Sequence, residues 1–258
     1  MKHTLPLFIA TTLVTLLFIG FATAKSLAEN ETFTVTKGGT LYLDSDAGSL
    51  DIESHGKDTV EVMVEKSGRN ADDFTVKFEQ RGNDVRIDGD RDGGWYSQLN
   101  VRFMIKVPEQ YNLAVKTGGG SIDLDKLNGE VKARTSGGSI SLGSIQGDVD
   151  VKTSGGSIRV DDVAGNINAH TSGGSIKATL RKQPTANCRL TTSGGSVTAY
   201  LDPSIKVDLY ASTSGGRVRS DIPVRGSIDK RSIKGDINGG GPDLVLKTSG
   251  GSVTIKEI

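Results

Sequence analysis

The stretch TSGGSI at residues 135–140 is repeated unchanged at 153–158 and at 171–176. Looser copies that fit Thr-[Ser/Gly]-Gly-Gly-[Ser/Arg]-[Ile/Val] extend the series to seven, which begin at Thr117, Thr135, Thr153, Thr171, Thr192, Thr213 and Thr248. Successive copies lie 18, 18, 18, 21, 21 and 35 residues apart. A period of about 20 residues is typical of a solenoid and is too short for a propeller blade.

The residues between the repeats alternate between apolar and polar with period 2. Five positions after each Thr stand Ile122, Ile140, Ile158, Ile176, Val197, Val218 and Val253, whereas the residue just before each Thr is polar or charged. Such alternation predicts strands with one face inward and one face in solvent. The sequence therefore predicts an all-β chain folded as a single-stack parallel β-solenoid with about 18–21 residues per rung. The 35-residue interval is interpreted as two rungs with an atypical corner at 239–242.

TSGG is expected to form a corner of each rung. Paired glycines allow a sharp turn through backbone conformations that are closed to residues with a Cβ, and Gly129, Gly147 and Gly165 are expected to supply positive φ at the second corner. Because the Thr shares parity with the inward residues, its hydroxyl should bond to backbone groups that the turn leaves unpaired. The alternative, a reactive Ser motif, lacks a base and an orienting acid at each copy.

Three segments are predicted along the chain. Residues 1–24 have the pattern of a signal peptide, with an apolar run at 5–21 followed by Ala22-Thr23-Ala24. Cleavage near Ala24 would place the chain in the periplasm or on the cell surface, and a retained signal would anchor it to the membrane. Residues 25–110 alternate without TSGG and are expected to form irregular N-terminal rungs or a cap, with a separate domain as the alternative. Residues 111–258 form the regular solenoid.

Charge and cysteine content narrow the function classes. The chain has 31 basic and 31 acidic residues, so no overall field favours nucleic acid. Cys188 is the only cysteine and cannot form an internal disulfide. It falls in an apolar column, so we expect an unreactive buried side chain.

Several stretches resemble the DUF4097 family, bacterial domains proposed as adhesins that have no assigned activity. The resemblance is carried by GGTLYLDSDAGSLDIES (38–54), VRFMIKVPEQYNLAVKTGGGSIDL (101–124), the TSGGSI series and GDINGGGPDLVLKTSGG (235–251). It covers nearly the whole chain after the signal. It implies a β-solenoid in an exported or surface protein, and it brings no catalytic residues.

No catalytic, cofactor-binding or metal-binding residues are predicted. A polysaccharide-cleaving solenoid would need carboxylates that converge on neighbouring rungs. The pairs Asp123/Asp125, Asp148/Asp150 and Asp161/Asp162 do not share a column in successive laps. We therefore expect a protein that is not an enzyme and needs no cofactor.

Two surfaces are candidates for partner binding. Residues 217–234 hold six basic residues, among them Arg225, Lys230, Arg231 and Lys234, against two acidic ones. This run is either a solvated face or a contact for an anionic glycan or lipid head group. Trp95 and Tyr96 lie in a Gly-rich loop and either contact a partner or cover the end of the solenoid.

The sequence thus favours an exported, non-enzymatic, adhesin-like scaffold that binds an envelope glycan, lipid or protein. A filament that assembles end to end is the alternative, and a carbohydrate-active enzyme is a third. Filament assembly should leave both end rungs uncapped, an enzyme should show converging carboxylates, and a binding protein should show a charged or aromatic patch.

Overall fold

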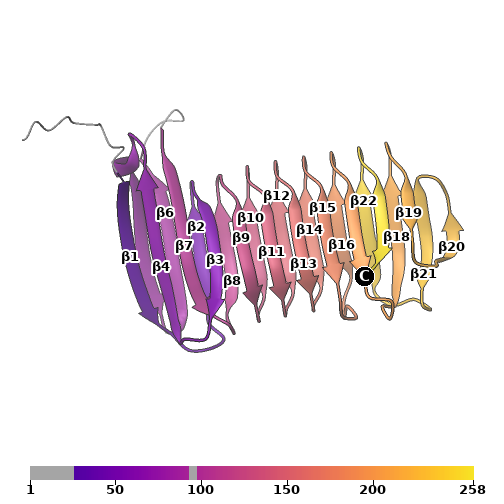
Figure 1. Cartoon of the computed structure of the whole chain (residues 1–258), viewed down its shortest axis with the longest axis horizontal. Helices are drawn as coiled ribbons and strands as arrows, with labels where there is room; N and C mark the ends of the chain where they lie inside the picture. Colours follow the sequence, from indigo (N-terminus) through magenta and orange to yellow (C-terminus); the bar gives the residue numbers. More distant parts are fainter. Residues whose placement is uncertain (1–25, 93–97) are drawn as a thin grey trace, which may run out of the picture.

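The computed structural model describes residues 26–92 and 98–258, which form two facing sheets wound from successive laps (Figure 1). The first sheet has the order β1 (Ser26–Thr34), β4 (Thr59–Ser67), β7 (Asn100–Pro108), β3 (Ser49–His55), β9 (Ile122–Leu127), β11 (Ile140–Ile145), β13 (Ile158–Val163), β15 (Ile176–Leu180), β17 (Val197–Leu201), β23 (Val253–Glu257), β19 (Val218–Ser220). The second sheet has the order β20 (Arg225–Ile228), β21 (Ser232–Ile237), β18 (Val207–Thr213), β22 (Asp243–Thr248), β16 (Cys188–Thr192), β14 (Ile167–Thr171), β12 (Val149–Thr153), β10 (Val131–Thr135), β8 (Asn112–Thr117), β2 (Thr40–Ser45), β6 (Asp84–Arg91), β5 (Phe74–Arg81).

Helical structure within the described residues is confined to the 3-10 turn Ala71–Asp73. No helix in this part of the chain is long and apolar enough to cross a membrane. The signal peptide predicted at residues 1–24 lies outside the described residues.

The regular laps have the predicted parallel register. Ile122, Ile140, Ile158 and Ile176 are direct partners along the first sheet, and each is at most 1% exposed. Each regular lap contributes one strand to each sheet, so the apolar columns of the two sheets meet in one continuous core. The all-β class and the parallel solenoid pattern are confirmed. The stacked laps form two sheets.

The threonines of the TSGG corners are buried, as their parity predicted. Each hydroxyl donates to a glycine carbonyl of the neighbouring rung, for example Thr135 to Gly120 at 2.8 Å and Thr153 to Gly138 at 2.7 Å. Each such bond satisfies a carbonyl that the corner would otherwise leave without a donor, so the Thr ladder fastens consecutive rungs along one edge.

The predicted reason for the corner glycines was wrong. Among the described TSGG-type corners only Gly120 has positive φ, at 102°. At the second corner, Gly129, Gly147 and Gly165 all lack positive φ. The constraint is the distance to the next rung: a Cβ on Gly147 would lie 2.2 Å from the carbonyl oxygen of Gly129. Glycine is needed because the corners of successive rungs touch backbone to backbone.

The order of laps at the C-terminal end also differs from the prediction. The interval 213–248 does not add two rungs in sequence order. The chain forms β18 and β19 and then the antiparallel hairpin β20–β21. It then returns, so that β22 lies between β16 and β18 and β23 lies between β17 and β19. The physical reason lies in the pairing of β18. The antiparallel strand β21 takes its outer edge, so β22 can pair with β18 only at the inner edge, beside β16.

Antiparallel strands close the N-terminal end of the solenoid. β1 pairs antiparallel with β4, and β5 pairs antiparallel with β6. Phe33 and Phe78 meet across the two sheets with ring centroids 6.2 Å apart. The buried ammonium of Lys66 pairs with Glu29 and donates to the carbonyl of Phe74 at 2.9 Å. At the opposite end the hairpin β20–β21 pairs antiparallel with β18.

Cys188 provides a first prediction on the core. Its side chain is 1% exposed, and burial raises the pKa of its thiol. Because the thiolate is the reactive form, we expect native Cys188 to react with a thiol reagent at least about a hundredfold more slowly than in urea. Raising the pH to 8.5 should not remove this protection, since the folded pKa is above the ordinary one. Rapid labelling of the folded protein would contradict the burial.

Candidate functional site: a basic cap and a methionine groove

The four cations predicted to bind a partner lie on one hairpin. Arg225 begins β20, Lys230 and Arg231 form the turn, and Lys234 lies in β21. All four are exposed. Trp95 and Tyr96, the predicted second contact, lie outside the described residues.

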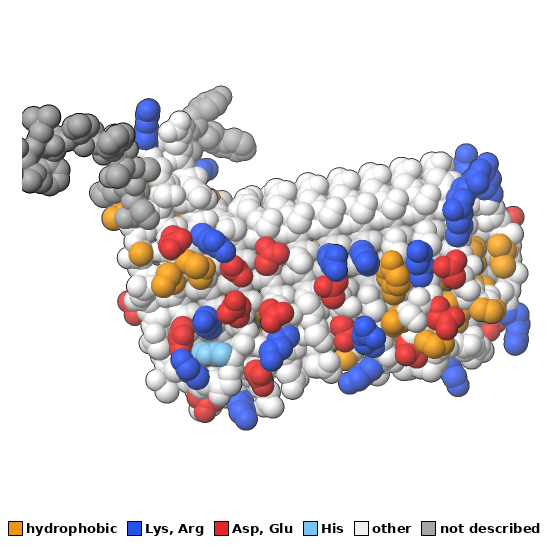
Figure 2. All heavy atoms as spheres, viewed as in Figure 1, with side chains coloured by type: hydrophobic (Ala, Val, Ile, Leu, Met, Phe, Trp, Pro, Cys, Tyr) orange, Lys and Arg blue, Asp and Glu red, His pale blue; other side chains and the backbone are white. Residues whose placement is uncertain are grey.

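The hairpin turn is fixed on the last TSGG corner. The carbonyl of Arg231 accepts a hydrogen bond from the amide of Thr213, and that of Lys230 accepts one from the amide of Val218, both at 3.0 Å. Arg217 belongs to the same corner, so cations from two separate segments of the chain lie together there. Figure 2 shows Lys and Arg side chains grouped at this end of the molecule.

We call the six cations of this region the basic cap: Arg217, Arg219, Arg225, Lys230, Arg231 and Lys234. None of them forms an ion pair with any residue that the structure describes. The ammonium of Lys234 lies 5.5 Å from the ring centroid of Tyr210, and Arg225 faces Asp236 across the hairpin ladder. Ile228 precedes the turn with 62% of its surface exposed, more than any other large apolar side chain of the described residues.

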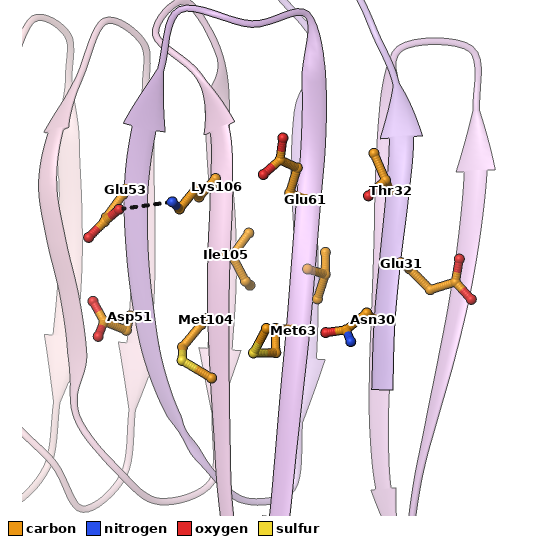
Figure 3. Close-up of a pocket in the computed structure, with 11 residues that line it drawn as sticks. Asn30, Glu31, Thr32, Asp51, Glu53, Glu61, Met63, Met104, Ile105 and Lys106 are labelled. Atoms are coloured by element: carbon orange, nitrogen blue, oxygen red, sulfur yellow. Dashed lines mark ion pairs between the residues drawn. The ribbon is translucent and has the colours of Figure 1, made fainter. Parts of the chain in front are cut away.

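A groove of about 490 Å³ lies on the outer face of the first sheet, across β1, β4, β7 and β3. Met63 and Met104 face each other in the β4–β7 register and form its floor (Figure 3). Glu61, Glu53 and Lys106 lie toward one end of these strands. We call this feature the methionine groove. This groove was not predicted from the sequence, although Met63 and Met104 both occupy outward positions of alternating strands, which are otherwise polar.

The structure gathers several carboxylates at one place that the comparison of columns did not predict. A hollow of about 270 Å³ beside the methionine groove is lined by Asp51, Glu53, Asp123, Asp125 and Asp161, among others. Asp51 and Asp123 are direct partners because β3 lies beside β9, although they are far apart in the chain. Burial and the neighbouring Asp51 raise the pKa of Asp123.

Most of these carboxylates have basic partners. Asp51 binds Arg102 at 2.8 Å, Asp161 binds Arg159 at 2.7 Å, and Glu53 lies 3.8 Å from Lys106. Within residues 26–92 and 98–258 no three His, Cys, Asp or Glu side chains are grouped so that they could hold a metal ion. The arrangement is a charged face of alternating sign.

The Toastrack DUF4097 family model matches residues 40–164 and again residues 143–256. The chain belongs to this family. The two overlapping matches reflect its internal repeat. Among solved structures, a proposed cell adhesion protein from Clostridium sporogenes is 15% identical with a TM-score of 0.40, covering 92% of this chain and 100% of its own. A proposed adhesin from Bacteroides fragilis is 12% identical with a TM-score of 0.45, covering 90% and 97%. No curated protein matches.

Proposed function

We propose that this Toastrack protein is an exported, non-enzymatic scaffold whose basic cap binds an anionic partner of the cell envelope. The observation that carries the proposal is the absence of ion pairs at the six cap cations among the described residues. Many outward cations elsewhere on the sheets have acidic partners, as in Lys116–Asp44 at 3.0 Å and Arg134–Asp150 at 3.2 Å. Lys152, Arg189 and Lys247 form no ion pair with a described residue either, but each lies on a separate strand, whereas the cap gathers six such cations. A group of cations with no carboxylate in ion-pair contact attracts anions.

The anionic partner is a lipid head group or a glycan, and Ile228 favours the lipid. An exposed aliphatic side chain beside cations gains free energy when it enters the boundary of a bilayer, and gains little from a hydrated sugar. The turn that carries these side chains is already held by two backbone hydrogen bonds, so little ordering is needed on binding. The antiparallel strands at both ends weigh against the alternative of an end-to-end filament.

The test replaces Arg225, Lys230, Arg231 and Lys234 with Gln. Each cation near an anionic surface contributes on the order of 1 kcal/mol, so binding to phosphatidylglycerol vesicles should fall by about a hundredfold or more. Binding by the unchanged protein should also weaken as salt is added, because exposed charges are screened. Vesicle co-sedimentation across a salt series measures both effects.

A matched control removes four cations from the sheet faces: Lys77, Lys116, Lys126 and Lys132 to Gln. These lysines already have acidic partners, so vesicle binding should be nearly unchanged. Ile228→Ser separates the two partner classes, since it should weaken binding to vesicles and leave binding to an immobilised anionic glycan intact. Equal binding by the cap variant and the unchanged protein, or no binding by either, would refute the proposal.

A further inference from the structure

An exposed tyrosine stands on the outer face of the second sheet, toward the N-terminal end of the solenoid. Tyr42 lies within β2 and is 41% exposed, more than any other aromatic side chain of the described residues. Its neighbours Leu41 and Leu43 are buried, so the outward ring adds nothing to the core. The ring makes no aromatic or cation–π contact with any residue that the structure describes. It is therefore open to a ligand.

Hollows lie on both sides of this ring. One, of about 330 Å³, is lined by Tyr42 together with residues of β5 and β6. The other, of about 200 Å³, is lined by Tyr42 with residues of β6, β8 and β10. The second hollow arises because Tyr42 is the partner of Ala114, which is in turn the partner of Lys132, so a small side chain lies between two long ones. We call Tyr42 with its two hollows the tyrosine platform.

The cations that line the two hollows all have acidic partners, so the platform carries little net charge. The ion pairs are Arg81–Glu79 at 2.8 Å, Arg86–Asp88 at 3.0 Å, Lys116–Asp44 at 3.0 Å, Lys132–Glu130 at 2.8 Å and Arg134–Asp150 at 3.2 Å. Unlike the basic cap, this surface therefore does not select a charged polymer.

The platform nevertheless has free hydrogen-bonding groups beside the ring. Arg86 donates to Asp88 through Nε, and its two terminal amino groups form no hydrogen bond with the described residues. One carboxylate oxygen of Asp84 accepts from the amide of Thr40 at 2.8 Å, and the other accepts from no described donor. A sugar hydroxyl can both donate and accept, and so it fits a surface that offers both kinds of group.

We propose that the tyrosine platform binds an uncharged glycan chain. The C–H face of one sugar ring stacks on the electron-rich face of Tyr42, while Arg86 donates to its hydroxyl groups and Asp84 accepts from them. The next sugar unit occupies the hollow above Ala114. A peptide cannot add here as an extra strand, because β2 is already paired with β6 and β8. The platform and the basic cap lie toward opposite ends of the second sheet, and the two sites are independent.

The experiment observes the ring directly. Protein labelled with ¹³C in its tyrosine rings is titrated with maltohexaose, cellohexaose and chitohexaose, and the Tyr42 resonances are assigned with Tyr42→Phe. At least one of these neutral oligosaccharides should shift the Tyr42 resonances to saturation and leave those of Tyr210 in place. Because the ligand has no charge, its affinity should stay constant across a salt series, in contrast to vesicle binding by the cap.

Variants at outward positions test the geometry. Tyr42→Ala should weaken binding about tenfold or more, whereas Tyr42→Phe keeps the ring face and should retain most of the affinity. Ala114→Leu fills the second hollow and should also weaken binding. The control is Tyr210→Ala, which removes an exposed tyrosine of the same sheet whose ring already lies beside Lys234, and it should leave the affinity unchanged.

Three outcomes would overturn the proposal: binding of none of the three oligosaccharides, unmoved Tyr42 resonances, or equal losses in Tyr42→Ala and Tyr210→Ala. None of them bears on the basic cap, which vesicle binding tests separately.

Discussion

Deletion of residues 242–258 is expected to unfold strands that the deletion leaves in the chain. β22 lies between β16 and β18 in the second sheet, and β23 lies between β17 and β19 in the first. The deletion therefore removes the rung on which β18–β21 rest. Leu244, Leu246, Val253 and Ile255 are fully buried there, and burial of each contributes about 1.5–3 kcal/mol. Their sum is comparable to the whole stability of a typical domain.

Hydrogen exchange measures this effect strand by strand. Amides of β18 and β21 should lose protection in the truncated protein, while those of β10–β13 keep theirs. A milder variant, Leu246→Ala, should cost about 2–5 kcal/mol and speed exchange in β16 and β18 alike, since both neighbours pack on the same side chain. The control Lys247→Ala changes an exposed residue of the same strand. Full protection of β18–β21 after truncation would show that this outer lap docks directly on β16 and β17.

The regular part of the fold could be predicted because its signal is local. Parity places Ile140 and Thr135 on the inward face, and the period of 18 places Ile158 and Thr153 above them. The order of laps at the ends could not be predicted in this way. The columns of every lap are similarly apolar. The pattern alone therefore does not determine that Leu244 of β22 lies between Cys188 of β16 and Leu209 of β18.

The candidate sites could likewise be predicted only where they depend on local sequence. The basic cap could be predicted as a run of charges, but the run does not reveal that Lys230 and Arg231 sit on the corner that holds Arg217. The methionine groove joins residues from four strands, and the acidic hollow joins Asp51 to Asp123. Both depend on which strands become neighbours, and at the N-terminal end that order departs from the order in the chain.

The second large effect is expected on stability, from alanine substitutions at the corner glycines. Comparing the adjacent variants Gly137→Ala and Gly138→Ala separates the contact between rungs from the conformation of the turn. A Cβ on Gly138 would lie 2.1 Å from the carbonyl oxygen of Gly120 on the neighbouring rung, whereas the nearest atom to a Cβ on Gly137 is 4.0 Å away. Neither glycine has positive φ, so the backbone conformation is open to alanine at both positions. Gly138→Ala must therefore separate two rungs.

That separation disturbs the Thr ladder as well as the packing. The oxygen in the way is the acceptor for the Thr135 hydroxyl, and the carbonyl of Gly138 accepts from Thr153. Overpacking costs about 1–3 kcal/mol and each weakened buried hydrogen bond about 1 kcal/mol, so Gly138→Ala should destabilise by about 3 kcal/mol or more. Gly137→Ala should be neutral or stabilise by up to about 1 kcal/mol, because alanine restricts the unfolded chain. Urea unfolding midpoints of the two variants decide the question: equal costs would mean that the turn conformation requires both glycines, and a large difference means that the spacing between rungs requires only the second.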